Sequence, residues 1–234
     1  AEVFRGLGLA PAGDDGTYFQ RFDFTSGVAL GEDNALTVAV DGEPRALAVG
    51  TDWTPLAFSR SGSVDAAGVV FAGYGIVAPA GEADGAFDSY GDLDVTDRWV
   101  LLWRGMPADL SAERRTALSR FADLRYKASV AKSRGARGVI FAPPPREGFE
   151  DGLPRLAYEA TTGAASLPVV AVDRAAMRRM LSILGDELDT VAARIEAGES
   201  AGRDLIGVTA STTIALDFER RQGRNVLARL DRSE

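Results

Sequence analysis

The sequence predicts a mixed α/β fold with a buried core, and three observations lead to this expectation. The chain has 234 residues, of which 46% are hydrophobic, enough to enclose a core in one large domain or two small ones. Short apolar runs such as Trp99–Trp103 and Gly138–Ala142 are typical of buried strands. Between these two runs, apolar residues recur at intervals of three and four, the period of a helix that packs one face on a sheet.

The first third of the sequence predicts strands joined by tight turns. In Tyr18–Phe24, aromatic and polar residues alternate with the period of a half-buried strand. Leu36–Val40 ends at the dipeptide Asp41-Gly42, and apolar residues resume at Ala46–Val49, a pattern that predicts a β-hairpin. The β-branched and aromatic residues of Asp65–Val77 predict a further strand with glycines toward its end.

Two helices are predicted in the rest of the chain. The first begins behind a candidate N-cap, Ser111, and closes at Gly135. The second follows the candidate cap Asp173, and its apolar stripe extends past Gly185 to Ile195. Three more strands are predicted, at Leu167–Val172, Thr213–Phe218 and Val226–Ala228.

Charge argues against nucleic acid as a partner. The net charge of -8 comes from 34 acidic and 26 basic residues, so phosphate backbones and anionic membranes are repelled on average. One basic run lacks interleaved aromatic residues that could stack bases, which favours a solvated helix face. The run consists of Arg114, Arg115, Arg120, Arg125, Lys127, Lys132 and Arg134.

The chain contains no histidine and no cysteine. The commonest general base, the commonest zinc ligand, thiol catalysis and disulfides are therefore excluded. Carboxylate, Ser/Lys or Tyr chemistry is all that remains. No apolar stretch is long enough to span a bilayer, and the start at Ala1-Glu2 has no signal peptide, so either one was removed or the chain begins inside a longer protein.

Two kinds of pattern suggest ligand binding: short glycine-rich motifs and a stretch of acidic residues. Gly73-Tyr74-Gly75 and Gly6-Leu7-Gly8 lack the third glycine and the strand-to-helix context of a dinucleotide site, which favours turn glycines. An acidic stretch supplies oxygen atoms for calcium, but its spacing does not match an EF-hand loop, which favours a solvated turn. A calcium-binding or small-molecule-binding module stays open as an alternative. The acidic residues are Asp84, Asp88, Asp92, Asp94 and Asp97.

Serines near basic residues suggest a second alternative, a small hydrolase that depends on a Ser/Lys pair or on carboxylates. No nucleophile elbow of the form Gly-x-Ser-x-Gly surrounds any of these serines, and serines and lysines on a helix are usually surface residues. The residues concerned are Ser59, Ser61 and Ser63 around Arg60 and Gly62, and Ser129 and Ser133 beside Lys127 and Lys132.

Seven segments, taken in order, carry a family resemblance. They are Tyr18–Phe22, Gly50–Ser59, Val70–Ile76, Asp94–Leu102, Ala131–Ile140, Leu167–Val172 and Asn225–Leu230. Their order resembles bacterial zinc aminopeptidases of the glutamate carboxypeptidase/transferrin receptor-like superfamily that carry a protease-associated (PA) insert. The resemblance covers nearly the whole chain and is firmest over residues 18–172. It departs at Asp97-Arg98, where relatives have a glycine and a lysine before the strand.

The resemblance implies a three-layer β/β/α swivelling domain with two sheet-packing helices and an extra ribbon from the flanking strands. Residues 1–30 would end the parent's N-terminal segment, 31–206 would form the PA insert, and 207–234 would begin the zinc-peptidase core. Because inserted domains usually have neighbouring termini, we expect Tyr18–Phe24 to pair antiparallel with Thr213–Phe218. This ribbon should leave aromatic residues partly uncovered, which favours self-association.

The resemblance implies a non-catalytic accessory role. In such peptidases two zinc ions are held by residues that follow the segment where this chain stops, so no catalytic, cofactor-binding or metal-ligating residue is assigned here. No cofactor is expected in this chain, and zinc is expected in the parent's core. The expected partners are the parent's catalytic domain, peptide or protein substrates, and a second copy in a weak homodimer through the flanking strands. The expected location is extracellular or periplasmic.

Overall fold

The structure is a computed structural model that describes residues 1–80, 86–146, 148–150, 152–158 and 165–230. Its contacts divide the chain into two compact units. The smaller unit combines both ends of the chain, Ala1–Ala29 and Asp217–Glu234, and the larger unit is the continuous segment Leu30–Leu216. In the described part of the chain, every helix is too short or too polar to cross a membrane.

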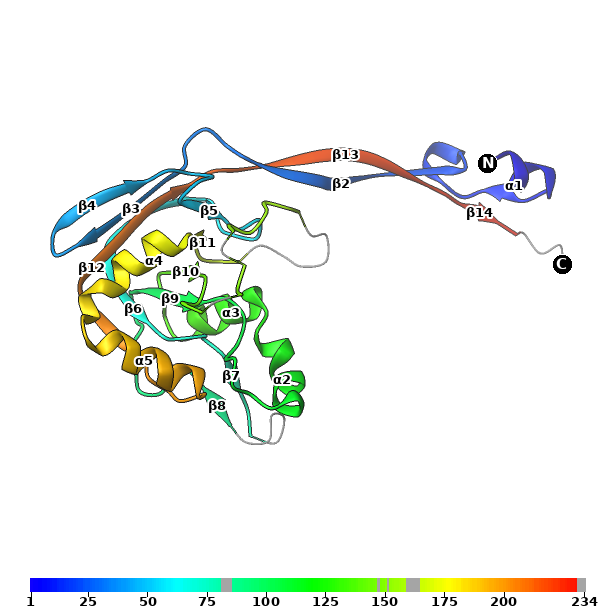
Figure 1. The fold of residues 1–234 in the computed structure, drawn as a ribbon. Coiled ribbons are helices and arrows are strands. Elements are labelled where there is room, and N and C mark those ends of the chain that lie inside the picture. Colours follow the sequence, from blue (N-terminus) through cyan, green and yellow to red (C-terminus); the bar gives the residue numbers. More distant parts are fainter. Residues whose placement is uncertain (81–85, 147, 151, 159–164, 231–234) are drawn as a thin grey trace. The chain divides into compact units, whose positions relative to one another are not determined.

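The smaller unit is built around a two-stranded ribbon (Figure 1). Its strands are β2 (Phe19–Leu30) and β13 (Leu216–Val226). They run antiparallel, because Gln20 is hydrogen-bonded to Asn225 whereas Ser26, further along β2, is bonded to the earlier Glu219. The remaining elements are α1 (Glu2–Gly6), β1 (Ala10–Pro11), the 3₁₀ turn η1 (Asp14–Gly16) and β14 (Ala228–Arg229), which pairs with β1.

The predicted pairing of the incoming and outgoing strands is confirmed, but its predicted register is wrong. The Tyr18 carbonyl accepts a hydrogen bond from the Leu227 amide at 2.8 Å, so Tyr18–Phe24 lies opposite residues that follow Thr213–Phe218. The reason is that Thr213 belongs to another strand, which pairs inside the larger unit. Partly uncovered aromatic side chains are present on the ribbon as expected: Phe22, Phe24 and Phe218 are each more than 40% exposed.

The larger unit contains an eight-stranded sheet in the order β4-β3-β12-β6-β9-β10-β11-β5. The four strands β6, β9, β10 and β11 run parallel, and the others are antiparallel to their neighbours. The predicted α/β class is confirmed. The strands are β3 (Ala35–Val40), β4 (Glu43–Leu47), β5 (Trp53–Pro55), β6 (Gly62–Phe71), β9 (Trp99–Trp103), β10 (Gly138–Ala142), β11 (Val169–Val172) and β12 (Arg203–Ile214); β7 (Val77–Ala78) and β8 (Phe87–Asp88) pair separately.

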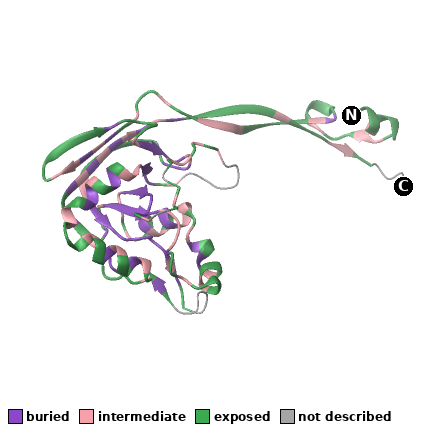
Figure 2. Ribbon diagram, in the orientation of Figure 1, coloured by how far each residue is buried: buried purple, intermediate pink, exposed green. Residues whose placement is uncertain are grey.

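The core lies on both faces of the parallel strands. Every residue of β9, β10 and β11 is buried (Figure 2), which explains their continuous apolar sequences. On one face, Val100 and Leu102 of β9 belong to a cluster that includes Ala128 and Ala131. The alternate residues of β9 point to the opposite face, since successive side chains of a strand alternate.

The helices follow the predicted caps but are more broken than expected. Ser111 caps α2 (Ala112–Leu118) by accepting a hydrogen bond from the Arg114 amide, and Asp173 caps α4 (Arg174–Leu181) in the same way. The single helix predicted from Ser111 to Gly135 is wrong, because α2 ends at Leu118 and Asp123 caps a separate helix after a 3₁₀ turn. The helix predicted from Asp173 to Ile195 is likewise interrupted at Gly185, whose φ is 50°. The other helical elements are η2 (Ser119–Phe121), α3 (Leu124–Ser133), η3 (Ser182–Leu184) and α5 (Glu187–Glu196).

The chain enters and leaves the larger unit at one point. The Gly31 amide donates to the Ala215 carbonyl at 3.0 Å, and the Asn34 side-chain amide bonds both backbone groups of Ala215. The unit continues to Leu216 and so includes all of β12, which the expected boundary between residues 206 and 207 divides. The predicted hairpin turn at Asp41-Gly42 is confirmed, with positive φ at both residues.

Candidate functional site

A small pocket lies where three segments of the larger unit meet. The turn Leu56–Phe58 is held against β11, because the Leu56 amide donates to the Val169 carbonyl at 3.0 Å. The N-terminus of α3 supplies Asp123–Arg125, and Pro154–Ala157 completes the lining without Leu156. The volume of this half-open pocket is about 140 Å³. It is far smaller than the roughly 300–1,000 Å³ of typical ligand and cofactor sites, so it suits one side chain rather than a cofactor.

Charged groups surround an apolar lining in this pocket. The Arg125 guanidinium lies over the Phe58 ring, 4.4 Å from its centroid, and Arg155 is exposed on the Pro154–Ala157 segment. Asp123 is the acidic residue of the lining, and its Oδ1 already accepts hydrogen bonds from two amides at the start of α3. The pocket was not predicted from the sequence, because its three segments are far apart along the chain and none carries a motif.

The segment after β10 is anchored by arginines. Arg174 donates to the Pro144 carbonyl at 2.8 Å, and Arg104 donates to the Glu150 carbonyl at 3.0 Å. Arg104 and Arg146 each lie 5.4 Å from the centroid of the Phe149 ring. These contacts anchor Pro144, Arg146, Phe149 and Glu150, which follow β10.

Lys127 is fully buried, so its interpretation as part of a solvated helix face is wrong. Its ammonium group donates to the carbonyl oxygens of Trp103 at 3.2 Å and Gly105 at 2.6 Å, and it lies 5.7 Å from the centroid of the Tyr74 ring. Burial lowers the pKa of Lys127 from 10.5 to about 7, against an opposing attraction from Asp123. From inside the core, the Lys127 side chain therefore provides hydrogen bonds to backbone carbonyl groups at and just after the end of β9.

A second, half-buried polar network joins the end of α5 to the loops after β6 and β9. Glu196 accepts a hydrogen bond from the Tyr74 hydroxyl at 2.5 Å and another from the Ala108 amide at 2.7 Å, and Arg146 lies 3.6 Å away. Burial, together with the bond to Glu196, raises the pKa of Tyr74 far above its ordinary value of 10. Because both carboxylate oxygens accept hydrogen bonds, Glu196 has a structural role and holds the two loops to the end of α5.

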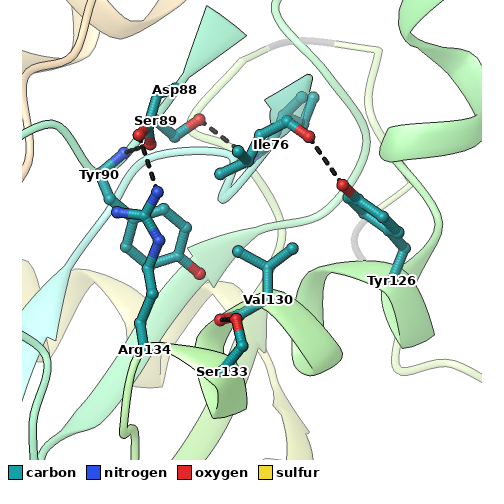
Figure 3. A network of polar contacts seen from close by, with 9 residues as sticks. Ile76, Asp88, Ser89, Tyr90, Tyr126, Val130, Ser133 and Arg134 are labelled. Atoms are coloured by element: carbon teal, nitrogen blue, oxygen red, sulfur yellow. Dashed lines mark hydrogen bonds and ion pairs between the residues drawn. The ribbon is translucent and has the colours of Figure 1, made fainter. Parts of the chain in front are cut away.

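Among the described residues of the acidic stretch, Asp88 is tied to Arg134 at the end of α3, and no metal-binding group of carboxylates is formed. Figure 3 shows Arg134 lying over the Tyr90 ring while it donates to Asp88 at 2.7 Å. Ser89 accepts from the Ile76 amide in the same network. The aspartates Asp92, Asp94 and Asp97 are exposed, and Asp84 lies outside the described residues. Asp94 accepts a hydrogen bond from the Thr96 amide, which lowers the pKa of Asp94. Asp97 lies 3.7 Å from Arg137.

Several of the serines that suggested a hydrolase form hydrogen bonds with the backbone. Ser59 is buried and accepts from the Val169 amide at 2.8 Å, which fixes the turn beside the pocket. Ser133 donates to the Val130 carbonyl, and Lys132 donates to Ser166. Gly73 and Gly75 have positive φ, in agreement with their interpretation as turn glycines.

The described residues show no cluster that fits a zinc site. Histidine and cysteine are absent from the sequence. Across residues 1–80, 86–146, 148–150, 152–158 and 165–230, no three carboxylates come together as a metal-binding group. Zinc in proteins is bound mainly by the two missing residue types.

Comparison with known proteins gives the family. A PA domain model matches residues 63–180, just over half of the chain. The chain belongs to the PA domain family. This PA domain has no match among curated proteins.

Solved structures similar to the PA domain include two of BSAP, a zinc aminopeptidase from Bacillus subtilis. One is 15% identical with a TM-score of 0.42, and the other is 16% identical with a TM-score of 0.40; each match covers 94% of this chain and 37% of BSAP. The psychrophilic subtilisin-like protease Apa1 from Pseudoalteromonas sp. AS-11 is 12% identical, with a TM-score of 0.36 and coverage of 82% and 36%. The chain thus spans little more than a third of each of these proteins.

Proposed function

We propose that this PA domain is a non-catalytic accessory domain of a secreted zinc aminopeptidase, where it gates substrate access or mediates protein or peptide interaction. The observation that carries the proposal is the single point at which the chain enters and leaves the larger unit, marked by the bond from Gly31 to Ala215. Such neighbouring ends suit a domain inserted into another fold. The zinc would belong to the parent's core, and the parent would be extracellular or periplasmic.

The chemistry of the chain supports an accessory role. The buried Lys127 and Tyr74 side chains and the half-buried Glu196 are each engaged with backbone carbonyls, an amide or one another. The pocket beside Phe58 has room for one side chain. This arrangement suits recognition of part of a peptide more than turnover of a substrate.

The first test is an assay of the purified chain on aminoacyl-nitroanilides, with and without added zinc. We expect no turnover, because carboxylates alone make a poor zinc site. Turnover that copurifies with the protein and is lost when one of its acidic residues is substituted would refute the proposal.

The second test uses the parent protein, with Leu30–Leu216 replaced by a short glycine-serine bridge. Since Gly31 and Ala215 are adjacent, the bridge can rejoin the ribbon strands without stretching them. We expect the ratio of kcat/KM for a long peptide to that for an aminoacyl-nitroanilide to change, while the nitroanilide is still hydrolysed. An unchanged ratio contradicts gating, and loss of nitroanilide hydrolysis contradicts a purely accessory role.

A further inference from the structure

We infer that a groove around Ile206 binds an extended segment of a partner protein in which an aliphatic side chain lies next to a lysine or arginine. The inference rests on the proposed function and names the chemistry of the partner. The groove lies where β12, the turn η3 and the start of α5 meet, and its volume is about 250 Å³. This volume is below the roughly 300–1,000 Å³ of typical small-molecule sites, so it suits a side chain of a protein. The lining consists of Ile183, Leu184, Glu187, Arg203, Asp204 and Ile206.

Ile206 is the apolar anchor of this groove. It is 79% exposed, whereas Leu205 and Val208 on the same strand are buried. The β-bulge in this part of β12 turns Ile206 away from the core. A single exposed aliphatic residue is common on protein surfaces, but Ile206 shares the groove with Ile183 and Leu184. An aliphatic side chain of a partner would therefore contact apolar groups from two elements, and its burial would supply the hydrophobic part of the affinity.

The backbone that presents Ile206 is held by the neighbouring hairpin. The Asp41 amide donates to the Gly207 carbonyl at 3.0 Å, and Gly207 has a φ of 92°. A Cβ atom at Gly207 would lie 2.7 Å from the Asp41 Oδ1 atom, so glycine is needed for the hairpin to approach this closely. The position of Ile206 is thus fixed before a partner arrives, which reduces the conformational entropy lost on binding.

The charges at the groove favour a cation in the partner. Arg203 lies 3.7 Å from Glu187, and Arg98 bonds Asp204 through two guanidinium nitrogens at 3.1 and 3.2 Å. Both arginines are therefore paired with acids. The Asp41 carboxylate lies against the bulge and forms no ion pair with the part of the chain that the structure describes. The uncompensated charge beside the groove is thus acidic, as is the net charge of -8, so a basic neighbour of the aliphatic side chain is attracted and an acidic one is repelled.

The experiment follows the isoleucine δ1 methyl signals of the full chain by NMR while one of two peptides is added. The probes are acetyl-Lys-Leu-Leu-Lys-amide and acetyl-Glu-Leu-Leu-Glu-amide, which differ in charge. The basic peptide should shift the signals of Ile206 and Ile183 at millimolar concentration and bind at least about threefold more tightly than the acidic one, since exposed ion pairs contribute modestly. The buried Ile76 and Ile140 should not shift.

Three results of this titration overturn the inference. They are equal affinity of the two peptides, no shift of Ile206 with the basic peptide, and a shift of Ile206 on dilution of the chain alone. The last of these would place a second copy of the chain in the groove.

Two variants with matched controls locate the binding. Ile206→Ser should abolish the shift of Ile183 by the basic peptide, whereas Val49→Ser, which alters an exposed aliphatic residue outside the groove lining, should retain it. Asp41→Asn should weaken the basic peptide about twofold, and asparagine tolerates the positive φ of this position. Asp65→Asn, which alters an exposed aspartate on β6, should leave the affinity unchanged.

The signals of Ile76 and Ile140 report whether each variant is folded, because both residues are fully buried. Binding of the basic peptide that survives Ile206→Ser places it elsewhere and overturns the inference. The selectivity of the parent can change on replacement of Leu30–Leu216 even if no peptide binds at Ile206, so failure of this experiment is distinguishable from failure of the proposed function.

Discussion

Lys127 should give this domain an unusual dependence of stability on pH. Its pKa is about 7 in the folded chain against 10.5 for an unperturbed lysine, with burial as the main cause. Between these two values the unfolded chain holds a proton that the folded chain has lost. The free energy of unfolding must then rise with pH, by at most about 1.4 kcal/mol per pH unit. The stability that depends on neutral Lys127 is thus present at alkaline pH and lost as pH falls through 7.

Integration over one titrating group gives the size of the effect. Between pH 7 and pH 9 the free energy of unfolding should increase by about 2 kcal/mol. Few other groups can contribute over this range, since the chain has no histidine, no cysteine and a single other lysine, Lys132. Tyr74 and Tyr90 act in the opposite direction but only near pH 10 and above, because burial raises the pKa of each in the folded state.

Urea denaturation followed by tryptophan fluorescence measures this dependence, because all three tryptophans are fully buried. Wild type should show the rise between pH 7 and pH 9, and Lys127→Met should remove it. Lys132→Met, which alters an exposed lysine five residues later on the same helix, should retain it. A flat or falling curve for wild type, or an equal slope in Lys127→Met, would refute the reasoning.

Three further predictions concern stability and metal binding. Asp123→Ala should lower the free energy of unfolding by about 1 kcal/mol in urea denaturation, since it removes an N-cap with two hydrogen bonds. The control Asp186→Ala, at an N-cap without a side-chain hydrogen bond, should change it by less than about 0.5 kcal/mol. Equal effects of the two substitutions would contradict the argument. Gly138→Ala should cost about 1–3 kcal/mol or more in the same assay, because the added methyl group meets the Trp99 ring, and a neutral result would show that the ring can move. Calorimetric titration with calcium should detect no tight binding at the aspartates of residues 84–97, and micromolar affinity would favour the binding-module alternative.

The elements that the sequence predicted well are those whose signal is local. The strand Trp99–Trp103, the hairpin turn at Asp41-Gly42 and the caps Ser111 and Asp173 depend on neighbouring residues, and each is present. The break at Asp123 was missed because the 3₁₀ turn before it preserves the spacing of apolar residues across two helices.

Most of β12 was missed for a different reason. Its buried residues change parity, from Leu205 to Val208 and Ala210, so no single alternation runs through the segment. The cause is a β-bulge between Leu205 and Thr209, where Gly207 has a φ of 92°. The departure from relatives at Asp97 has a related explanation, since its φ of 56° lies in the region that glycine favours.

The basic run illustrates why the candidate site could not be predicted from charge alone. In the sequence it lacks interleaved aromatic residues, but in the fold Arg125 and Arg134 lie over Phe58 and Tyr90, which come from other segments. Those ring faces are covered by the protein's own guanidinium groups, so they cannot serve to stack bases. Lys127 in the same run is inside the core. One stretch of positive charge therefore contributes to the core, to an ion pair and to the wall of a pocket, and long-range contacts decide which residue does which.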